Sequence, residues 1–256
     1  MRLKEIYELI DRFAPFELSD MYGKLTGFQD NSGIIIGSDS DITNVVFSLD
    51  LTDKTIEYAQ WVKAGLIITH HPAIFTGIKS IDGVLLKAAN AGIGVISCHI
   101  NFDVAEKGVD YFLAKGVANP EDKEIEILEP LLSGTGYGRR YPVNLSLEEL
   151  AAHVEEEFKT KVHVYGDRTA YVKKAASFCG AGLDSKALSY PADVYISADV
   201  RHHVLVEAIQ KGKRVIAMTH FASENYGLKC IYKHFVNIYR LKNKLDFYFF
   251  DDERFV

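Results

Sequence analysis

In the first half of the chain, segments with the apolar spacing of a helix alternate with segments that have the apolar pattern of a strand. Residues 2–14 carry apolar side chains three and four positions apart, which predicts an amphipathic helix that Pro15 ends. Short apolar runs between glycine or polar residues predict buried strands. Helices with N-cap and glycine stop signals separate these runs. We expect the strands at 33–37, 45–49, 66–69 and 93–98, and the helices at 52–64, 82–91 and 103–115.

The stretch 119–147 breaks this pattern with prolines and a cluster of glycine turns. We place a boundary there, between a first unit at 1–125 and a second at 126–256, and leave the chain ends free to pack back on the first unit. Alternating strands and helices predict the α/β class, as two similar α/β units with mixed, largely parallel sheets. In the second unit we expect helices at 147–158 and 203–211, and strands at 161–165, 170–179, 193–198, 214–219 and 247–250.

One segment in each unit has the same order of features. Residues 47–50 and 196–199 each end a strand in Ser-x-Asp, and each leads through a helix and a glycine to a second strand. The second strands end in Thr69-His70 and Thr219-His220. This match predicts an internal duplication, with two similar units facing each other and a metal site between them. It treats His70 and His220 as equivalent.

Composition narrows the classes of function. The chain has 256 residues, of which 48% are hydrophobic, so it can bury a large core. A net charge of −6 argues against nucleic acid as a partner. Three widely spaced cysteines argue against a disulfide framework or a thiolate zinc site. The N-terminus does not read as a signal peptide, and no apolar run is long enough to span a membrane, so we expect a cytoplasmic protein.

Histidines gather where the apolar runs end. In open α/β sheets, ligands bind outside the carboxyl ends of the strands, and imidazole is the commonest metal-ligating side chain. Glu224 follows His220 by four residues, so a helix would bring the two side chains to one face. Adjacent histidines on a strand point to opposite faces, so the His70-His71 pair suits two neighbouring ions. The pattern predicts a site for two divalent metal ions with the ligands His70, His71, Asp103, His220 and Glu224.

Each piece of this site has a purely structural alternative. The adjacent histidines could be an exposed loop pair, Asp103 could cap a helix, and His220 with Glu224 could be a surface helix pair. Nitrogen and oxygen ligands without thiolate suit zinc, iron, manganese or nickel, and the sequence does not choose among them.

Other residues are candidates for catalysis and substrate binding. His99 follows the strand at 93–98 and is a candidate catalytic residue, a metal ligand or a group that orients a ligand. Gly180 and Gly182 lie in a glycine turn whose amides could contact substrate, or in an ordinary tight turn. His202 and His203 either bind substrate or simply start a helix.

Six short motifs occur in order along the chain: Asp30-Asn31-Ser32-Gly33 and residues 69–72, 101–103, 178–182, 199–203 and 220–224. In these motifs the chain resembles the GTP cyclohydrolase I type 2 family, also called the Nif-three-like family. The family implies a two-domain α/β fold, the same five metal ligands between the domains, and a ring-shaped hexamer built as a trimer of dimers. Residues Cys98 to Asn101 and the positions of Ala198 and Val200 depart from the family pattern, and the chain has no room for the large middle domain of many relatives.

The resemblance implies hydrolysis of GTP, a small-molecule nucleotide substrate. In this reaction the guanine ring opens at C8, formate leaves and dihydroneopterin triphosphate forms. His99, His202 or His203 would move protons, since imidazole titrates near neutrality. Two alternatives stay open. One is a two-metal hydrolase of a different substrate, such as a phosphodiester. The other is a metal-binding hexameric scaffold that interacts with other proteins.

Overall fold

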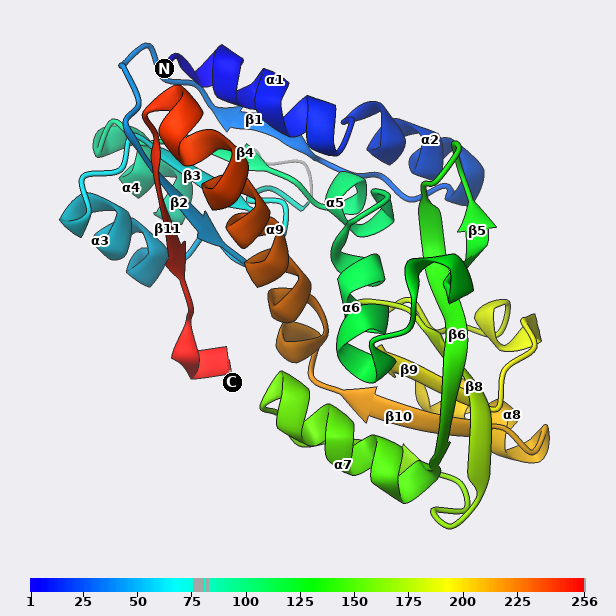
Figure 1. Ribbon diagram of the computed structural model, residues 1–256. Coiled ribbons are helices and arrows are strands. Elements are labelled where there is room, and N and C mark those ends of the chain that lie inside the picture. Colours follow the sequence, from blue (N-terminus) through cyan, green and yellow to red (C-terminus); the bar gives the residue numbers. More distant parts are fainter. Residues whose placement is uncertain (76–80, 82, 256) are drawn as a thin grey trace. The chain divides into compact units, whose positions relative to one another are not determined.

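The computed structural model describes residues 1–75, 81 and 83–255 (Figure 1). Contacts within the chain divide it into two compact units. Unit 1 contains residues 1–105 and 228–255, and unit 2 contains residues 106–227. Within the described residues, each unit is built on one mixed sheet with helices. The predicted α/β class with two mixed sheets is therefore confirmed.

Unit 1 contains a five-stranded sheet in the order β1-β4-β3-β2-β11. Its last four strands in this order are parallel, and β1 is antiparallel to β4. The strands are β1 (Gly33–Ile36), β2 (Asn44–Ser48), β3 (Leu66–Thr69), β4 (Gly94–Ser97) and β11 (Asp246–Phe250). The helices are α1 (Leu3–Phe13), α2 (Glu17–Thr26), α3 (Asp53–Trp61), α4 (Gly83–Asn90), α5 (Ile100–Val104) and the 3₁₀ helix η3 (Glu253–Phe255).

Helices cover both faces of this sheet because the side chains of its central strands are buried on both faces. On one face, Val46, Ile67 and Val95 form a core cluster with residues of α3 and α4. On the other, the ring of Phe47 lies 5.5 Å from that of Phe235 on α9 (His220–Asn243). Continuous apolar runs are typical of strands covered on both sides, so the sequence pattern agrees with this layering.

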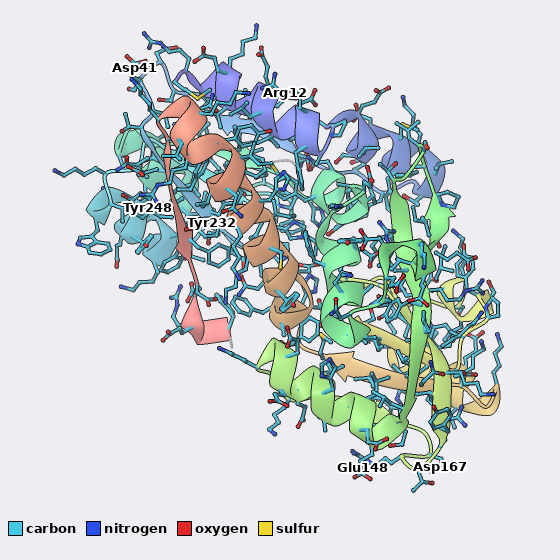
Figure 2. All side chains as sticks on the ribbon, viewed as in Figure 1. Arg12, Asp41, Glu148, Asp167, Tyr232 and Tyr248 are labelled. Carbon is cyan, nitrogen blue, oxygen red and sulfur yellow. The ribbon has the colours of Figure 1, made fainter. Side chains whose placement is uncertain are left out.

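The C-terminal segment completes the sheet of unit 1. Strand β11 pairs in parallel with β2 at the edge of the sheet. The Tyr232 hydroxyl of α9 donates a hydrogen bond to the Phe247 carbonyl of β11 at 3.3 Å, and Figure 2 labels Tyr232 and the neighbouring Tyr248. The aromatic strand is confirmed, but only part of it is buried as expected: Phe247 is buried, whereas Tyr248 and Phe250 are half-buried because the strand forms an edge.

Unit 2 contains a six-stranded sheet in the order β5-β6-β8-β9-β10-β7. Strands β8, β9 and β10 are parallel, and the other three pair antiparallel to their neighbours. The strands are β5 (Glu126–Pro130), β6 (Gly136–Ser146), β7 (His163–Tyr165), β8 (Tyr171–Ser177), β9 (Val194–Ala198) and β10 (Arg214–Met218). The helices are α6 (Val109–Ala118), α7 (Leu147–Phe158), α8 (His202–Gln210) and the 3₁₀ helices η1 (Asp122–Glu124) and η2 (Ala187–Ser189).

The stretch interpreted as a broken connection contains the long strand β6. Pro142 is tolerated there because it borders an irregularity in the β6–β8 register, where a ladder hydrogen bond is not required. Helix α6 packs against β6 and β8, so by contacts unit 2 begins at Glu106, whereas the sequence boundary was placed at 125/126.

Three helices differ from the sequence expectation, and one of them is α9, which was predicted only as a possible helical turn at His220 and Glu224. The segment 103–115, predicted as one helix, is divided between α5 and α6, because the chain is extended at Ala105 and α6 begins after Gly108. Helix α2 was not predicted. The first residue of the helix expected at 82–91 lies outside the described residues. In the described part of the chain, no helix has the length and apolar character needed to cross a membrane.

Candidate metal centre

His70 directly follows β3 and is fully buried in unit 1. Its Nδ1 lies 2.9 Å from the carbonyl oxygen of Cys98, which follows β4. A carbonyl oxygen only accepts hydrogen bonds, so Nδ1 carries the proton and Nε2 presents its lone pair. That Nε2 lies 3.4 Å from Oδ1 of Asp103. The side chain is therefore set in the tautomer that a metal ligand requires.

His71 is set in the same way by a carboxylate. Its Nδ1 lies 2.7 Å from Oδ1 of Asp50, which follows β2. The chain here is held in place, since the Thr69 hydroxyl donates to the His71 carbonyl at 2.9 Å. The two adjacent imidazole centroids are 5.2 Å apart. Parallel pairing of β2 and β3 is what brings Asp50 to His71, because both follow the carboxyl ends of neighbouring strands.

His99 follows β4 and is bound to a third carboxylate. Its Nδ1 lies 2.7 Å from Oδ1 of Asp30, and its backbone N–H donates to the Ser32 hydroxyl at 2.9 Å. Ser32 in turn donates to the other oxygen of Asp30 at 2.6 Å. Burial acts to raise the pKa of Asp30, but the hydrogen bonds from His99 and Ser32 outweigh it and hold that pKa below the ordinary value. Asp30 therefore stays ionised and orients His99.

Asp103 is buried in the short helix α5. The alternative interpretation of Asp103 is a cap at a helix N-terminus. Asp103 is instead the fourth residue of α5, and its backbone N–H donates to the His99 carbonyl at 3.1 Å. The side-chain donor atoms of His70, His99 and Asp103 all lie within 4.8 Å of one another. This group in unit 1 has the size and the donor atoms of a metal site.

Within unit 2, an imidazole and a carboxylate lie close together at the start of α9. His220 Nε2 lies 3.1 Å from Oε2 of Glu224, one helical turn later. His220 Nδ1 lies 2.6 Å from Oδ2 of Asp199, which follows β9. The Glu224 side chain is buried, whereas that of His220 is 35% exposed. The helical spacing predicted this shared face.

Gly180 shapes the space that Glu224 occupies. It adopts a left-handed backbone conformation with φ of +57°, and a Cβ at this position would overlap the Glu224 carboxylate and lie 3.3 Å from the His220 ring. Its N–H donates to the Ser223 hydroxyl at 3.1 Å, and its carbonyl accepts from the Ser197 hydroxyl at 3.0 Å. The structure thus gives Gly180 a role in placing Glu224.

The remaining candidates for substrate contact lie elsewhere in unit 2. Gly182 leaves room for the Tyr137 ring, which a Cβ would overlap. His202 and His203 are exposed at the start of α8. A contact between substrate and any of these three residues stays a prediction.

The alignment of the two copies of the internal repeat was wrong by one residue. The sequence match made His70 equivalent to His220, but the structure pairs Asp50 with His71 and Asp199 with His220. In both pairs the two residues are 21 positions apart. Sequence reasoning did not identify Asp50, Asp199 and Asp30 as the orienting groups. The signal was present in the Ser-x-Asp ends of the two strands and in the Asp30-Asn31-Ser32 motif.

The residues present fit divalent metal ions. Imidazole nitrogen and carboxylate oxygen are the donors that zinc, iron, manganese and nickel accept. Metal-bound histidines characteristically donate their other ring N–H to a carboxylate or a backbone carbonyl. His70, His71, His99 and His220 each have such a partner at Nδ1.

Comparisons with known proteins identify relatives by sequence and by structure. The family model described as Duf34/NIF3 (NGG1p interacting factor 3) matches residues 1–254. A Campylobacter jejuni protein named GTP cyclohydrolase 1 type 2 homolog is 30% identical over 247 residues, which is 93% of either chain. A Methanocaldococcus jannaschii protein of the same name is 30% identical and covers 90% of this chain and 92% of its own. The crystal structure of a Staphylococcus aureus hypothetical protein superposes with a TM-score of 0.85 at 25% identity, over 98% of this chain and 96% of that one.

Proposed function

The chain belongs to the Duf34/NIF3 (NGG1p interacting factor 3) family, and from this premise we propose that it is a hydrolase that uses two divalent metal ions and acts on GTP. One observation supports the metal-dependent part of the proposal most directly. Four histidines have a carbonyl or a carboxylate partner at Nδ1, which leaves Nε2 as the reactive nitrogen. In this proposal, Nε2 of His70, His71 and His220 binds metal, and Nε2 of His99 carries protons.

The proposed metal ligands are the residues that the sequence pattern indicates. In unit 1 they are His70, His71 and Asp103, and in unit 2 they are His220 and Glu224. Bound there, divalent ions would lower the pKa of water far enough to supply hydroxide near neutral pH. The orienting carboxylates Asp50 and Asp199 hold the imidazoles and raise their basicity as ligands.

His99 is the proton carrier in this proposal. Asp30 holds its Nδ1 at 2.7 Å, which leaves Nε2 to take a proton from water or to give one to the leaving group. The ionised Asp30 carboxylate stabilises the imidazolium that forms, because opposite charges attract strongly in a partly buried site. A hydrolase that opens a heterocycle requires such a group, since nitrogen must be protonated as its bond to carbon breaks.

The choice of GTP follows the name shared by the relatives from Campylobacter and Methanocaldococcus. One water would attack C8 of guanine and open the ring, and a second would release formate. The ribose carbons would then rearrange and close the new ring with loss of one water, giving dihydroneopterin triphosphate. Two metal ions also serve phosphoryl transfer, so a phosphodiester is the alternative substrate of the same residues.

A turnover assay tests this proposal. The full chain, reconstituted with zinc, iron(II) or manganese(II), is incubated with GTP, and formate and the fluorescent pterin are measured after oxidation. We expect both products from the wild type and neither from Glu224→Gln. Glu148→Gln is the matched control, because Glu148 is exposed on α7. The absence of product from protein with two bound metal ions per chain would refute the GTP reaction.

The family description favours one further candidate, a metal-binding scaffold. It refers to a factor that interacts with NGG1p, a protein partner. On this alternative the chain forms a homohexamer and has no turnover. A Glu224→Gln variant that loses metal but keeps its cellular role would support it.

A further inference from the structure

Two exposed phenylalanines lie beside the imidazoles of unit 1. The Phe28 ring centroid is 5.9 Å from that of His99, and the Phe75 centroid is 6.0 Å from the same imidazole. Phe75 also lies 6.2 Å from His71. Phe28 is 44% exposed and Phe75 is 60% exposed. A single exposed phenylalanine needs no explanation, but two around one polar cluster suggest a binding surface.

The loops that carry these rings are tied together. Helix α2 ends at Gly27, which is left-handed with φ of 77°, and the N–H of Phe28 then donates to the Thr26 hydroxyl at 3.2 Å. Further along the same loop, the Asn31 side-chain amide donates to the Ile74 carbonyl at 2.7 Å. This bond joins the Phe28 loop to the residue before Phe75. Because this bond holds Asn31 and Ile74 together before a ligand binds, the ligand loses less free energy in fixing the residues beside them.

We propose that Phe28 and Phe75 form an aromatic rim that binds a planar heteroaromatic ring of the substrate beside His99. This inference rests on the proposed function for the identity of the substrate and names the part of it that is bound in unit 1. A phenyl ring stacks on any planar base, because every base has a π-face. A sugar or a phosphate has no such face.

In this proposal the phenyl rings and the imidazoles have different roles in binding the substrate. Phenylalanine has no hydrogen-bonding group, so the two rings add affinity without distinguishing one heterocycle from another. His71 and His99, the polar side chains beside the two rings, would then distinguish one heterocycle from another and take part in the reaction. The rim would hold the heterocycle where the Nε2 of His99 can exchange a proton with it.

Equilibrium binding tests the rim without relying on turnover. The metal-loaded full chain is titrated in a calorimeter with GTP and with ribose 5-triphosphate, which lacks the base. We expect GTP to bind more tightly to the wild type, and Phe28→Leu/Phe75→Leu to lose about tenfold or more in GTP affinity. The affinity for ribose 5-triphosphate should not change. Phe255→Leu is the matched control, since Phe255 is 49% exposed elsewhere in unit 1.

The outcomes separate the rim from the proposed reaction. If the wild type turns over GTP and the double variant binds GTP equally well, the rim is refuted and the reaction stands. If the wild type binds guanosine or a pteridine, loses that binding in the variant and forms no product, the rim stands and the GTP reaction fails. Failure of the wild type to bind any planar heterocycle overturns the rim. Dissociation of an oligomer by the double variant, seen by sedimentation, would assign the rings to an interface between copies and also overturn it.

Discussion

The two orienting carboxylates of the repeat allow a matched test of the metal site. Asp50→Asn and Asp199→Asn each keep an oxygen that accepts the Nδ1–H of histidine but remove the charge. Loss of such a partner weakens metal binding by about 10- to 100-fold, or about 1.4–2.7 kcal/mol. The Asp50–His71 side chains are 35% and 14% exposed, whereas the Asp199–His220 side chains are 60% and 35% exposed. Solvent screens the second pair more, so we expect an effect near 100-fold at Asp50 and near tenfold at Asp199.

Zinc affinity is measured by competition with a chelating fluorescent indicator, with circular dichroism to check that each variant is folded. Asp41→Asn is the control, because Asp41, labelled in Figure 2, lies at the surface. It pairs with Arg2. Unchanged affinity in both variants would contradict the assignment of His71 and His220 as metal ligands. A larger loss at Asp199 than at Asp50 would contradict the reasoning from solvent screening.

Three further predictions follow. Gly180→Ala should lose metal affinity in the indicator assay, because its Cβ overlaps the Glu224 carboxylate, whereas Gly212→Ala, with a φ of +67° but open space, should show only the backbone strain of about 1–2 kcal/mol in denaturant unfolding. His99→Gln should keep both metal ions by elemental analysis and lose about 10²–10⁴-fold in kcat; loss of metal would instead make His99 a ligand. Burial raises the pKa of Asp110 to about 6 despite the nearby Arg139, so the folded protein holds this proton more tightly than the unfolded chain. The free energy of unfolding, measured relative to Asp110→Asn, should therefore fall by about 3 kcal/mol as pH rises from about 3 to 7, with about 2 kcal/mol of this fall between pH 4 and 6, and a difference independent of pH would refute this account.

The parallel strands were predictable because their apolar runs are continuous and bounded by turn residues. The long strand β6 was not, since its glycines and Pro142 are typical of loops when they are read locally. Gly138 is required there because a Cβ would overlap the Phe178 ring, which is a tertiary contact. Local sequence cannot reveal such a constraint.

The candidate ligands were identified from their positions after strands, but their orienting partners were not. His99 and Asp30 are 69 positions apart, and no periodicity connects them. The Asp50–His71 and Asp199–His220 pairs depend on the register of neighbouring strands, and the repeat aligned His70 with His220 where the structure makes His71 the equivalent residue. A single-residue shift decides which imidazole meets the carboxylate, and that shift is set by strand pairing.

The order of the strands in unit 1 has a consequence for synthesis on the ribosome. Strand β2 emerges early, but its parallel neighbour β11 is made about 200 residues later, after the whole of unit 2. Until then the nascent chain carries the apolar residues Val45 to Phe47 on a strand with one open edge, which is a template for aggregation. Unit 2 is contiguous in sequence and has no such delay. A nascent chain stalled before residue 246 should therefore engage chaperones through its N-terminal strands while its central sheet is already formed.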